Sequence, residues 1–357
     1  MRVLCVDVGM GTSDVLLYDD GAREENRTHL VVPSATQVVG SEIRQATERG
    51  VPVAFTGHLM GGGPSTVAML SHVERGLPFY ADPWAARTFS DDLDEVAAMG
   101  VRQVDRHEIE ARVSEGAVRV QSGDLRLRQL LEALRLLGET APLDGIAVAV
   151  QDHGEAPAGV SDRVFRFQKL AHLLADTGDL GRLFFSADSI PSYFTRMRAA
   201  AACVTGEPEG RRLDVVVGDT GPSALWGAAL TTGAPCLAVN YGNGHTLMGR
   251  VTGRCVDGLF EHHTSKVSPE MMASYVRRFA AGALENSEVL SSGGHGVIAG
   301  AHPFSLDEVE LRVTGPNRRR FRGIAPREVE VALHGDMMIT GCYGLLEGYR
   351  AATGSGR

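Results

Sequence analysis

The feature of this sequence that most constrains its fold is a strand, a short glycine turn and a returning strand, found once in each half of the chain. Near the N-terminus, the apolar runs 2–8 and 14–18 flank the small segment GMGTS. In the second half, the runs 236–240 and 246–252 flank the turn YGNGHT. Such runs separated by glycine turns are typical of β-hairpins. We therefore predict two α/β halves, each built around one hairpin.

The length of 357 residues indicates two domains of about 150–200 residues each. A polar break over 205–212 (TGEPEGRR) separates the two patterns, so we predict lobes at 1–204 and 205–357. The continuous apolar run 145–151 predicts a central buried strand. We expect a further hairpin at 117–127. Apolar periodicity predicts helices at 37–49, 65–75, 127–137, 163–175, 193–203, 269–282 and 336–352.

Composition narrows the classes of function. The net charge of −9 and the pI of 5.8 argue against a nucleic-acid-binding role, which requires a basic face. We find no apolar run of 18 residues, so we expect no membrane-spanning segment and a cytoplasmic protein. The five cysteines are at least nineteen residues apart and form no CxxC pattern. Because three closely spaced thiolates hold the cluster of a radical iron–sulfur enzyme, we exclude that class.

The N-terminal turn carries the most specific chemical pattern, Asp7-x-Gly9-x-Gly11-Thr12-Ser13-Asp14. Glycines allow backbone N–H groups to converge on an anion without obstruction by a Cβ atom. Thr12 and Ser13 add hydroxyl donors, and Asp7 at the end of the strand can hold Mg²⁺, usually through water. The pattern therefore predicts a phosphate and Mg²⁺ site; a plain tight hairpin is the alternative.

This string resembles the first phosphate loop of the actin, sugar-kinase and Hsp70 superfamily. The resemblance implies a two-lobed actin-like ATPase (ribonuclease H-like) fold with a central nucleotide cleft, and ATP and Mg²⁺ as cofactors. Residues 145–163 resemble the carbohydrate-kinase segment that faces the substrate. This resemblance implies that Gln151, His153 and Arg163 contact the substrate.

The start of the second half, residues 214–246, resembles the second-lobe opening of the same kinases. This match implies that Asp219 is the catalytic base. Asp152 is the alternative base, and a turn-capping role is the alternative for Asp219. The match also places the second phosphate loop at Gly242, Asn243, Gly244, His245 and Thr246, where Gly-Asn-Gly-His-Thr replaces the Gly-Thr-Ser of the kinases. Gly293 and Gly294 fall where those kinases contact adenosine.

Histidines are concentrated in the second half, at His245, His262, His263 and His295. Three imidazoles and a carboxylate would suit Zn²⁺ or Fe²⁺, but His262 and His263 point to opposite sides of a strand. We expect instead that some of them, His262 and His263 included, line the cleft and bind an acidic substrate or phosphate. Ordinary hydrogen-bonded structure is a further alternative. The loop 57–65 precedes a helix and is a further candidate anion site, and a flexible turn is the alternative.

Over the whole chain, the strings MGGGP, QDHG, GNGHT, EHHT and GGHG resemble a prokaryotic family that is often labelled as a pyruvate formate-lyase-activating protein. The cysteine spacing conflicts with that label. We expect an ATP-dependent phosphotransferase or ATPase acting on a small polar metabolite. The alternatives are a nucleotide-binding switch or assembly factor with slow hydrolysis, and a metal-dependent enzyme that uses the histidine cluster.

Overall fold

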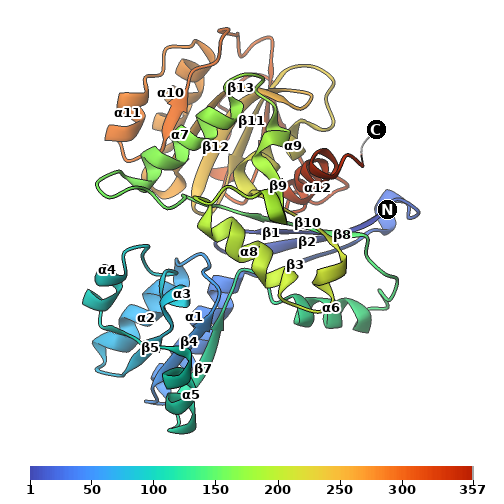
Figure 1. The fold of residues 1–357 in the computed structure, drawn as a ribbon. Helices are drawn as coiled ribbons and strands as arrows, with labels where there is room; N and C mark the ends of the chain where they lie inside the picture. The colour runs from blue at the N-terminus through green and yellow to red at the C-terminus, as the bar shows by residue number, and fades with distance from the viewer. Residues whose placement is uncertain (356–357) are drawn as a thin grey trace.

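The computed structural model describes residues 1–355, which form three β-sheets with helices packed on their faces. Figure 1 shows the second large sheet at the top, the first large sheet below it, and a small sheet at the lower left. None of the helices among the described residues is both long and apolar enough to cross a membrane.

The first large sheet has the strand order β3-β2-β1-β8-β10-β9. Strands β1 to β3 are antiparallel neighbours, and β8 and β10 run parallel to β1. The strands are β1 (Arg2–Val8), β2 (Thr12–Asp19), β3 (Thr28–Pro33), β8 (Gly145–Val150), β9 (Phe184–Ser186) and β10 (Asp214–Asp219). Strands β1 and β8 are buried along their whole length, because both faces of the sheet carry helices.

The second large sheet repeats this arrangement in the order β14-β13-β12-β11-β15-β16. Its strands β11 to β13 are antiparallel, and β15 and β16 run parallel to β11. The strands are β11 (Cys236–Tyr241), β12 (His245–Thr252), β13 (Cys255–His263), β14 (Gly296–Ile298), β15 (Glu310–Thr314) and β16 (Glu328–Glu330). This duplication confirms the predicted fold of two α/β lobes with mixed sheets and the two predicted hairpins.

A four-stranded parallel sheet, absent from our prediction, is inserted between β3 and β8 in the order β6-β5-β4-β7. Its strands are β4 (Val53–Gly57), β5 (Phe79–Ala81), β6 (Val101–Gln103) and β7 (Val118–Ser122). Its helices are α1 (Ala35–Glu48), α2 (Pro64–Glu74), α3 (Pro83–Ala86), α4 (Leu93–Ala98) and α5 (Arg106–Ser114). The predicted hairpin at 117–127 is wrong, because β7 pairs in parallel with β4 and the chain then enters a helix.

The remaining helices cover the two large sheets. They are α6 (Leu127–Leu136), α7 (Asp162–Leu174), α8 (Thr195–Thr205), α9 (Thr220–Ala229), α10 (Pro269–Ala280), α11 (Asn286–Ser291) and α12 (Thr340–Thr353). Helices α9 and α12 pack against each other, and one apolar core joins them to strands of both large sheets. A Cβ atom added to Gly344 would lie 1.8 Å from the carbonyl oxygen of Ser223, so only glycine permits this approach.

The strands divide between the two large sheets after Asp219, not at residue 205. Strand β10 pairs with β8 and therefore belongs to the first sheet. The division of the chain into lobes at 204 and 205 stays a prediction about folding units. Residues 214–219, which we expected at the opening of the second lobe, form a strand that pairs within the first sheet.

Candidate functional site

The turn between β1 and β2 is closed by backbone pairing on both sides. Val8 and Ser13 form the last pair of the ladder. Beyond this pair, the N–H group of Gly9 donates to the carbonyl oxygen of Thr12 at 2.9 Å. A Cβ atom at Gly9 would lie 3.1 Å from the same oxygen, so the turn favours glycine at its first position.

The turn between β11 and β12 has the same construction. Tyr241 and Thr246 form the last pair, and the N–H group of Gly242 donates to the carbonyl oxygen of His245 at 3.0 Å. Two turns of equal length are thus closed by equivalent hydrogen bonds. In this correspondence, His245 occupies the place of Thr12.

Neighbouring segments hold the carbonyl oxygens of both turns. Ser34 donates from its hydroxyl to the carbonyl of Met10 at 2.9 Å and from its N–H to the carbonyl of Gly11 at 3.2 Å. At the turn between β11 and β12, the side-chain amide of Asn317 donates to the carbonyl of Gly242 at 3.0 Å. These backbone carbonyl oxygens of the turns are therefore already bonded to other parts of the protein.

Unlike these carbonyl oxygens, the backbone N–H groups at the tips of the turns have no hydrogen-bond partner among residues 1–355. These are the N–H groups of Met10, Gly11, Asn243 and Gly244. The tips also approach each other, since a Cβ atom at Gly11 would lie 2.7 Å from the side-chain amide of Asn243. Backbone N–H groups left free on glycine turns are a common way in which proteins bind anions.

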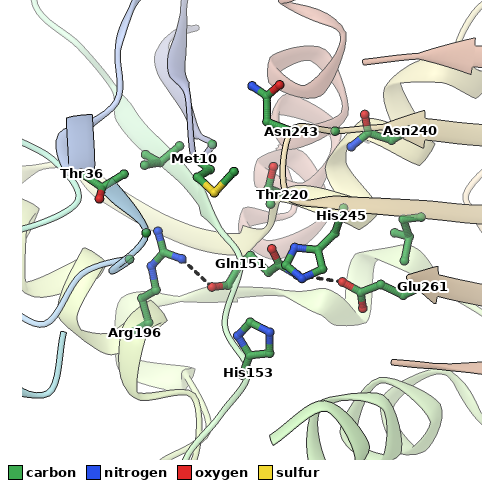
Figure 2. A pocket seen from close by; sticks show the side chains of 18 of the residues that line it. Met10, Thr36, Gln151, His153, Arg196, Thr220, Asn240, Asn243, His245 and Glu261 are labelled. Carbon is green, nitrogen blue, oxygen red and sulfur yellow. Dashed lines mark hydrogen bonds between the residues drawn. The ribbon is translucent and has the colours of Figure 1, made fainter. Parts of the chain in front are cut away.

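A cavity of about 240 Å³ opens beside these turns. Both turns line it, together with the loop 61–63, Gln151, His153 and, from the second lobe, Glu261. Figure 2 shows Met10 and Thr36 on one side of this space and Asn243 on the other, with His153 and His245 below. The loop 61–63 belongs to the predicted loop 57–65, which therefore reaches the site. Its role in binding an anion stays a prediction.

A smaller cavity of about 90 Å³ adjoins the turns and contains two carboxylates, Asp7 and Asp14. They face each other across β1 and β2. Burial raises the pKa of Asp7 to about 7, although a hydrogen bond from the hydroxyl of Thr220 lowers it. Burial and the charge of Asp7 raise the pKa of Asp14 to about 8.

These two carboxylates fit the requirements of a divalent cation. Oδ1 of Asp14 is buried and has no hydrogen-bond partner among the described residues. A Cβ atom at Gly341 would lie 2.0 Å from Oδ2 of Asp7, so the start of α12 leaves room for this oxygen only because residue 341 is glycine. Paired oxygen ligands of this kind are those that Mg²⁺ prefers.

Asp219 lies at the N-terminus of α9, in the interior of the protein. It forms an ion pair with Arg166, with guanidinium-to-carboxylate distances of 2.5 and 3.0 Å, and caps α9 by accepting from the N–H of Gly221. Glu261 accepts from the Nε of Arg166 at 2.9 Å. Both oxygens of Asp219 are thus engaged, and the turn-capping alternative describes its observed contacts. Its role as a base stays a prediction.

Asp152, the alternative base, is also buried and engaged. Its oxygens accept from the N–H groups of Gly154 and Met197, each at 2.8 Å. Burial raises its pKa to about 6, although these two N–H donors lower it. Neither Asp152 nor Asp219 lines the two cavities described above.

Three histidines from distant parts of the chain meet at one end of the larger cavity. Ligand atoms of His153, His245 and His295 all lie within 4.8 Å of one another. Nδ1 of His295 lies 3.7 Å from Oε2 of Glu261. Burial would raise the pKa of Glu261, but the Arg166 guanidinium and then His295 hold it well below its usual range.

The residues predicted for the site divide into two groups. The larger or the smaller cavity is lined by Asp7, Gly9, Thr12, Gln151, His153, Gly242, Asn243, Gly244 and His245. Neither cavity is lined by Gly11, Ser13, Asp152, Arg163, Asp219, Thr246, His262, His263, Gly293 or Gly294.

Several residues of the second group make hydrogen bonds within the protein instead of lining a cavity. Arg163 donates to the carbonyl of Gly294, and Thr246 bonds the hydroxyl of Thr264. Both ring nitrogens of His262 have partners, the carbonyl of His263 and the hydroxyl of Ser292.

Several residues of the site escaped prediction. They line the cavity and are Arg166, Arg196, Thr220 and Asn240. Glu261 also lines it, and the sequence marked this residue only as the carboxylate beside the histidines. Helical periodicity offered a signal for Arg166, because it lies three residues after Arg163 on α7 and so on the same face. No local pattern marks Arg196, whose Nη1 donates to the carbonyl of Gln151 at 2.8 Å (Figure 2).

Comparison with known proteins gives one family match. The profile of the family described as "Putative pyruvate format-lyase activating enzyme (DUF1786)" matches residues 60–320, more than half of the chain. Among curated proteins, none matches the sequence.

Three solved structures overlap weakly with this one. The ethanolamine utilization protein EutJ from Carboxydothermus hydrogenoformans is 12% identical, with 97% of this chain and 89% of that chain covered and a TM-score of 0.35. An exopolyphosphatase-like protein is 9% identical, with coverages of 88% and 65% and a TM-score of 0.26. The Ppx/GppA phosphatase of Aquifex aeolicus is 9% identical, with coverages of 78% and 62% and a TM-score of 0.25. The chain thus spans less than two thirds of the latter two, and scores this low carry no argument about function.

The cysteines do not support the activity in the family description. Cys5, Cys203, Cys236 and Cys342 are buried, whereas Cys255 is exposed. Among residues 1–355, no three of them come close enough to hold a metal. A site for an iron–sulfur cluster, which needs several thiolates at one point, is therefore absent from the described chain.

Proposed function

We propose that this chain, which belongs to the DUF1786 family, binds the phosphate tail of ATP between its two hairpin turns and acts as an ATP-dependent phosphotransferase or ATPase on a small polar metabolite. The observation that supports this proposal is the set of four N–H groups without acceptors at Met10, Gly11, Asn243 and Gly244. They belong to two facing turns, one from each lobe, and both turns line the same cavity.

Backbone donors suit this chain because it has few cationic alternatives. Its only lysines are Lys169 and Lys266, and neither lines the larger cavity. Arg166 and Arg196 do line it, but each is already paired with buried carboxylates. Phosphate would therefore be held mainly by aligned N–H dipoles, with the Thr12 hydroxyl at the edge of the smaller cavity.

Mg²⁺ would be held by Asp7 and Asp14, whose buried oxygens fit an oxygen-ligated dication. When bound, the ion neutralises charge on the phosphates and orients them for transfer. Thr220 donates to Oδ1 of Asp7 at 2.5 Å, and this bond keeps that carboxylate in place beside the turns. The protein thus supplies position and charge compensation, which is most of what phosphoryl transfer requires.

The metabolite would occupy the end of the larger cavity beyond the turns. Polar groups converge there: Gln151 donates from its side chain to Glu261 at 2.8 Å, and its carbonyl accepts from Arg196. A cavity of about 240 Å³ suits a small molecule better than a polymer, and the few polar groups in its largely apolar lining would orient that molecule.

Thermal unfolding with ATP, ADP and AMP, each with and without Mg²⁺, tests the proposal. Binding to the native state alone stabilises it by about 2.7 kcal/mol at a hundredfold excess over Kd. We expect a Mg²⁺-dependent shift with ATP and ADP, a smaller shift with AMP, and loss of the Mg²⁺ dependence in Asp7→Asn. Asp188→Asn, at an exposed aspartate, is the matched control. No shift with any nucleotide, or an equal shift with AMP, would contradict the proposal.

A further inference from the structure

The three histidines at the end of the larger cavity come from three separate places in the fold. His153 follows β8 of the first sheet, His245 begins β12, and His295 directly precedes β14 of the second sheet. Their ring centroids are 4.7 to 5.8 Å apart. The ring of His263 also packs against this group, 4.6 Å from His245 and 4.9 Å from His295. Imidazoles packed this closely need a physical reason.

The nitrogens of this cluster lack hydrogen bonds. His295 is fully buried, and neither of its ring nitrogens has a partner among the described residues. Nε2 of His245 is also buried without a partner. Elsewhere the chain satisfies its buried histidines, since His72 bonds Thr47 and the carbonyl of Pro78. Because an unmet buried polar group destabilises a protein, these nitrogens point to a missing ligand.

The electrostatic surroundings favour a cation rather than an anion. Arg166 pairs with both Asp219 and Glu261, and the carboxylate of Glu261 lies 3.7 Å from Nδ1 of His295. A neutral imidazole with a free lone pair is the form that binds a metal, and the unpartnered ring nitrogens of His245 and His295 can supply such lone pairs.

We infer that His153, His245 and His295 form a binding site for one divalent transition-metal ion. Imidazole nitrogens select Zn²⁺, Fe²⁺, Ni²⁺ or Cu²⁺ over Mg²⁺, so this site is chemically distinct from the carboxylate pair Asp7 and Asp14. Three protein ligands leave a coordination position open, as in catalytic zinc sites. That position faces the cavity, because His153 and His245 line it.

The site also joins the two lobes, since His153 follows a strand of the first sheet and the other two ligands belong to the second. A bound ion would hold the lobes together at one end of the cavity. Its open position would take an oxygen ligand, either water or an oxygen of the bound metabolite. This inference does not depend on nucleotide binding.

Calorimetric titration of the chelator-treated full chain with Zn²⁺ tests the inference. We expect one Zn²⁺ per chain. Replacing a residue that only hydrogen-bonds a metal ligand typically costs about 10- to 100-fold in affinity, and His153→Asn, His245→Asn and His295→Asn should each cost more than that. His302→Asn is the matched control, because that side chain is 81% exposed; it should bind Zn²⁺ like the unmodified protein.

A second measurement uses the unmodified protein and so does not depend on the folding of a variant. The visible spectrum of Co²⁺ bound to the unmodified protein should show a low-coordinate, nitrogen-ligated ion that Zn²⁺ displaces at one equivalent. Absence of stoichiometric binding, a Co²⁺ spectrum of the fully hydrated ion, or unchanged affinity in folded His295→Asn would each overturn the inference.

Discussion

Replacing Asp14 by asparagine should stabilise the protein when no metal is bound. Asp14 lies opposite Asp7 across β1 and β2, and its Oδ1 has no partner among the described residues. Burial and the charge of Asp7 raise its pKa from 3.8 to about 8. At about 1.4 kcal/mol per pKa unit, the upper limit of the cost of ionising it in the folded state is about 6 kcal/mol. Partial exposure and screening reduce this, so we expect Asp14→Asn to gain about 1–3 kcal/mol at pH 8.

The pH dependence follows from the direction of the shift. A carboxyl group with a raised folded-state pKa binds its proton more tightly in the folded than in the unfolded protein. Its contribution to stability is fully present below about pH 4 and is lost as the pH rises toward 8. The advantage of Asp14→Asn should therefore be largest at pH 8, smaller at pH 5 and absent below pH 4.

Urea unfolding at pH 5 and pH 8, with and without Mg²⁺, measures these effects. Mg²⁺ should stabilise the unmodified protein at pH 8 and have much less effect on Asp14→Asn, because the variant lacks one of the two charged ligands. Asp188→Asn, at an exposed position, should change neither quantity. A metal-free Asp14→Asn protein that is less stable at pH 8, or a gain that is equal at both pH values, would refute the reasoning.

Two further predictions concern the interior. Asp219→Ala should lower the free energy of unfolding by about 3–5 kcal/mol in urea titrations, because it leaves the buried guanidinium of Arg166 without its main partner; unchanged stability with lost turnover would instead favour the role of Asp219 as a base. Gly344→Ala should cost about 1–3 kcal/mol by thermal unfolding, because the new Cβ would lie 1.8 Å from the backbone oxygen of Ser223. Gly233→Ala, where nothing lies within 4 Å, is its control, and an equal effect of the two would contradict the close helix contact.

Local patterns were sufficient to predict the parts of the site that lie within one hairpin. The turn glycines and Asp7 are adjacent in sequence, and the alternation of apolar residues around them defines both strands. Residues 242–245 could be identified as the counterpart of 9–12 for the same reason. The predicted helix 127–137 was equally accessible, since its period of 3.6 is regular and the observed helix spans Leu127–Leu136.

Features that depend on pairing between distant segments could not be predicted in this way. The sequence of strand β10 predicts a buried strand but not its sheet, and only its pairing with β8 places it in the first sheet. The histidine cluster joins residues 153, 245 and 295, and no spacing in the sequence signals that they meet. The sequence pointed to His245 and His295 but grouped them with the adjacent pair His262 and His263, not with His153. His262 proves to be hydrogen-bonded through both nitrogens.

Amide NMR of the uniformly labelled chain can observe directly whether the two facing turns bind a phosphate tail through their free N–H groups. On addition of ATP with Mg²⁺, we expect large shifts of the amide resonances of Met10, Gly11, Asn243 and Gly244. The amides of Gly9 and Gly242, which already donate within their turns, should keep their hydrogen bonds. Unchanged resonances of the four amides at saturating ATP and Mg²⁺, or a response only of amides outside both turns, would show that the turns do not bind the phosphates.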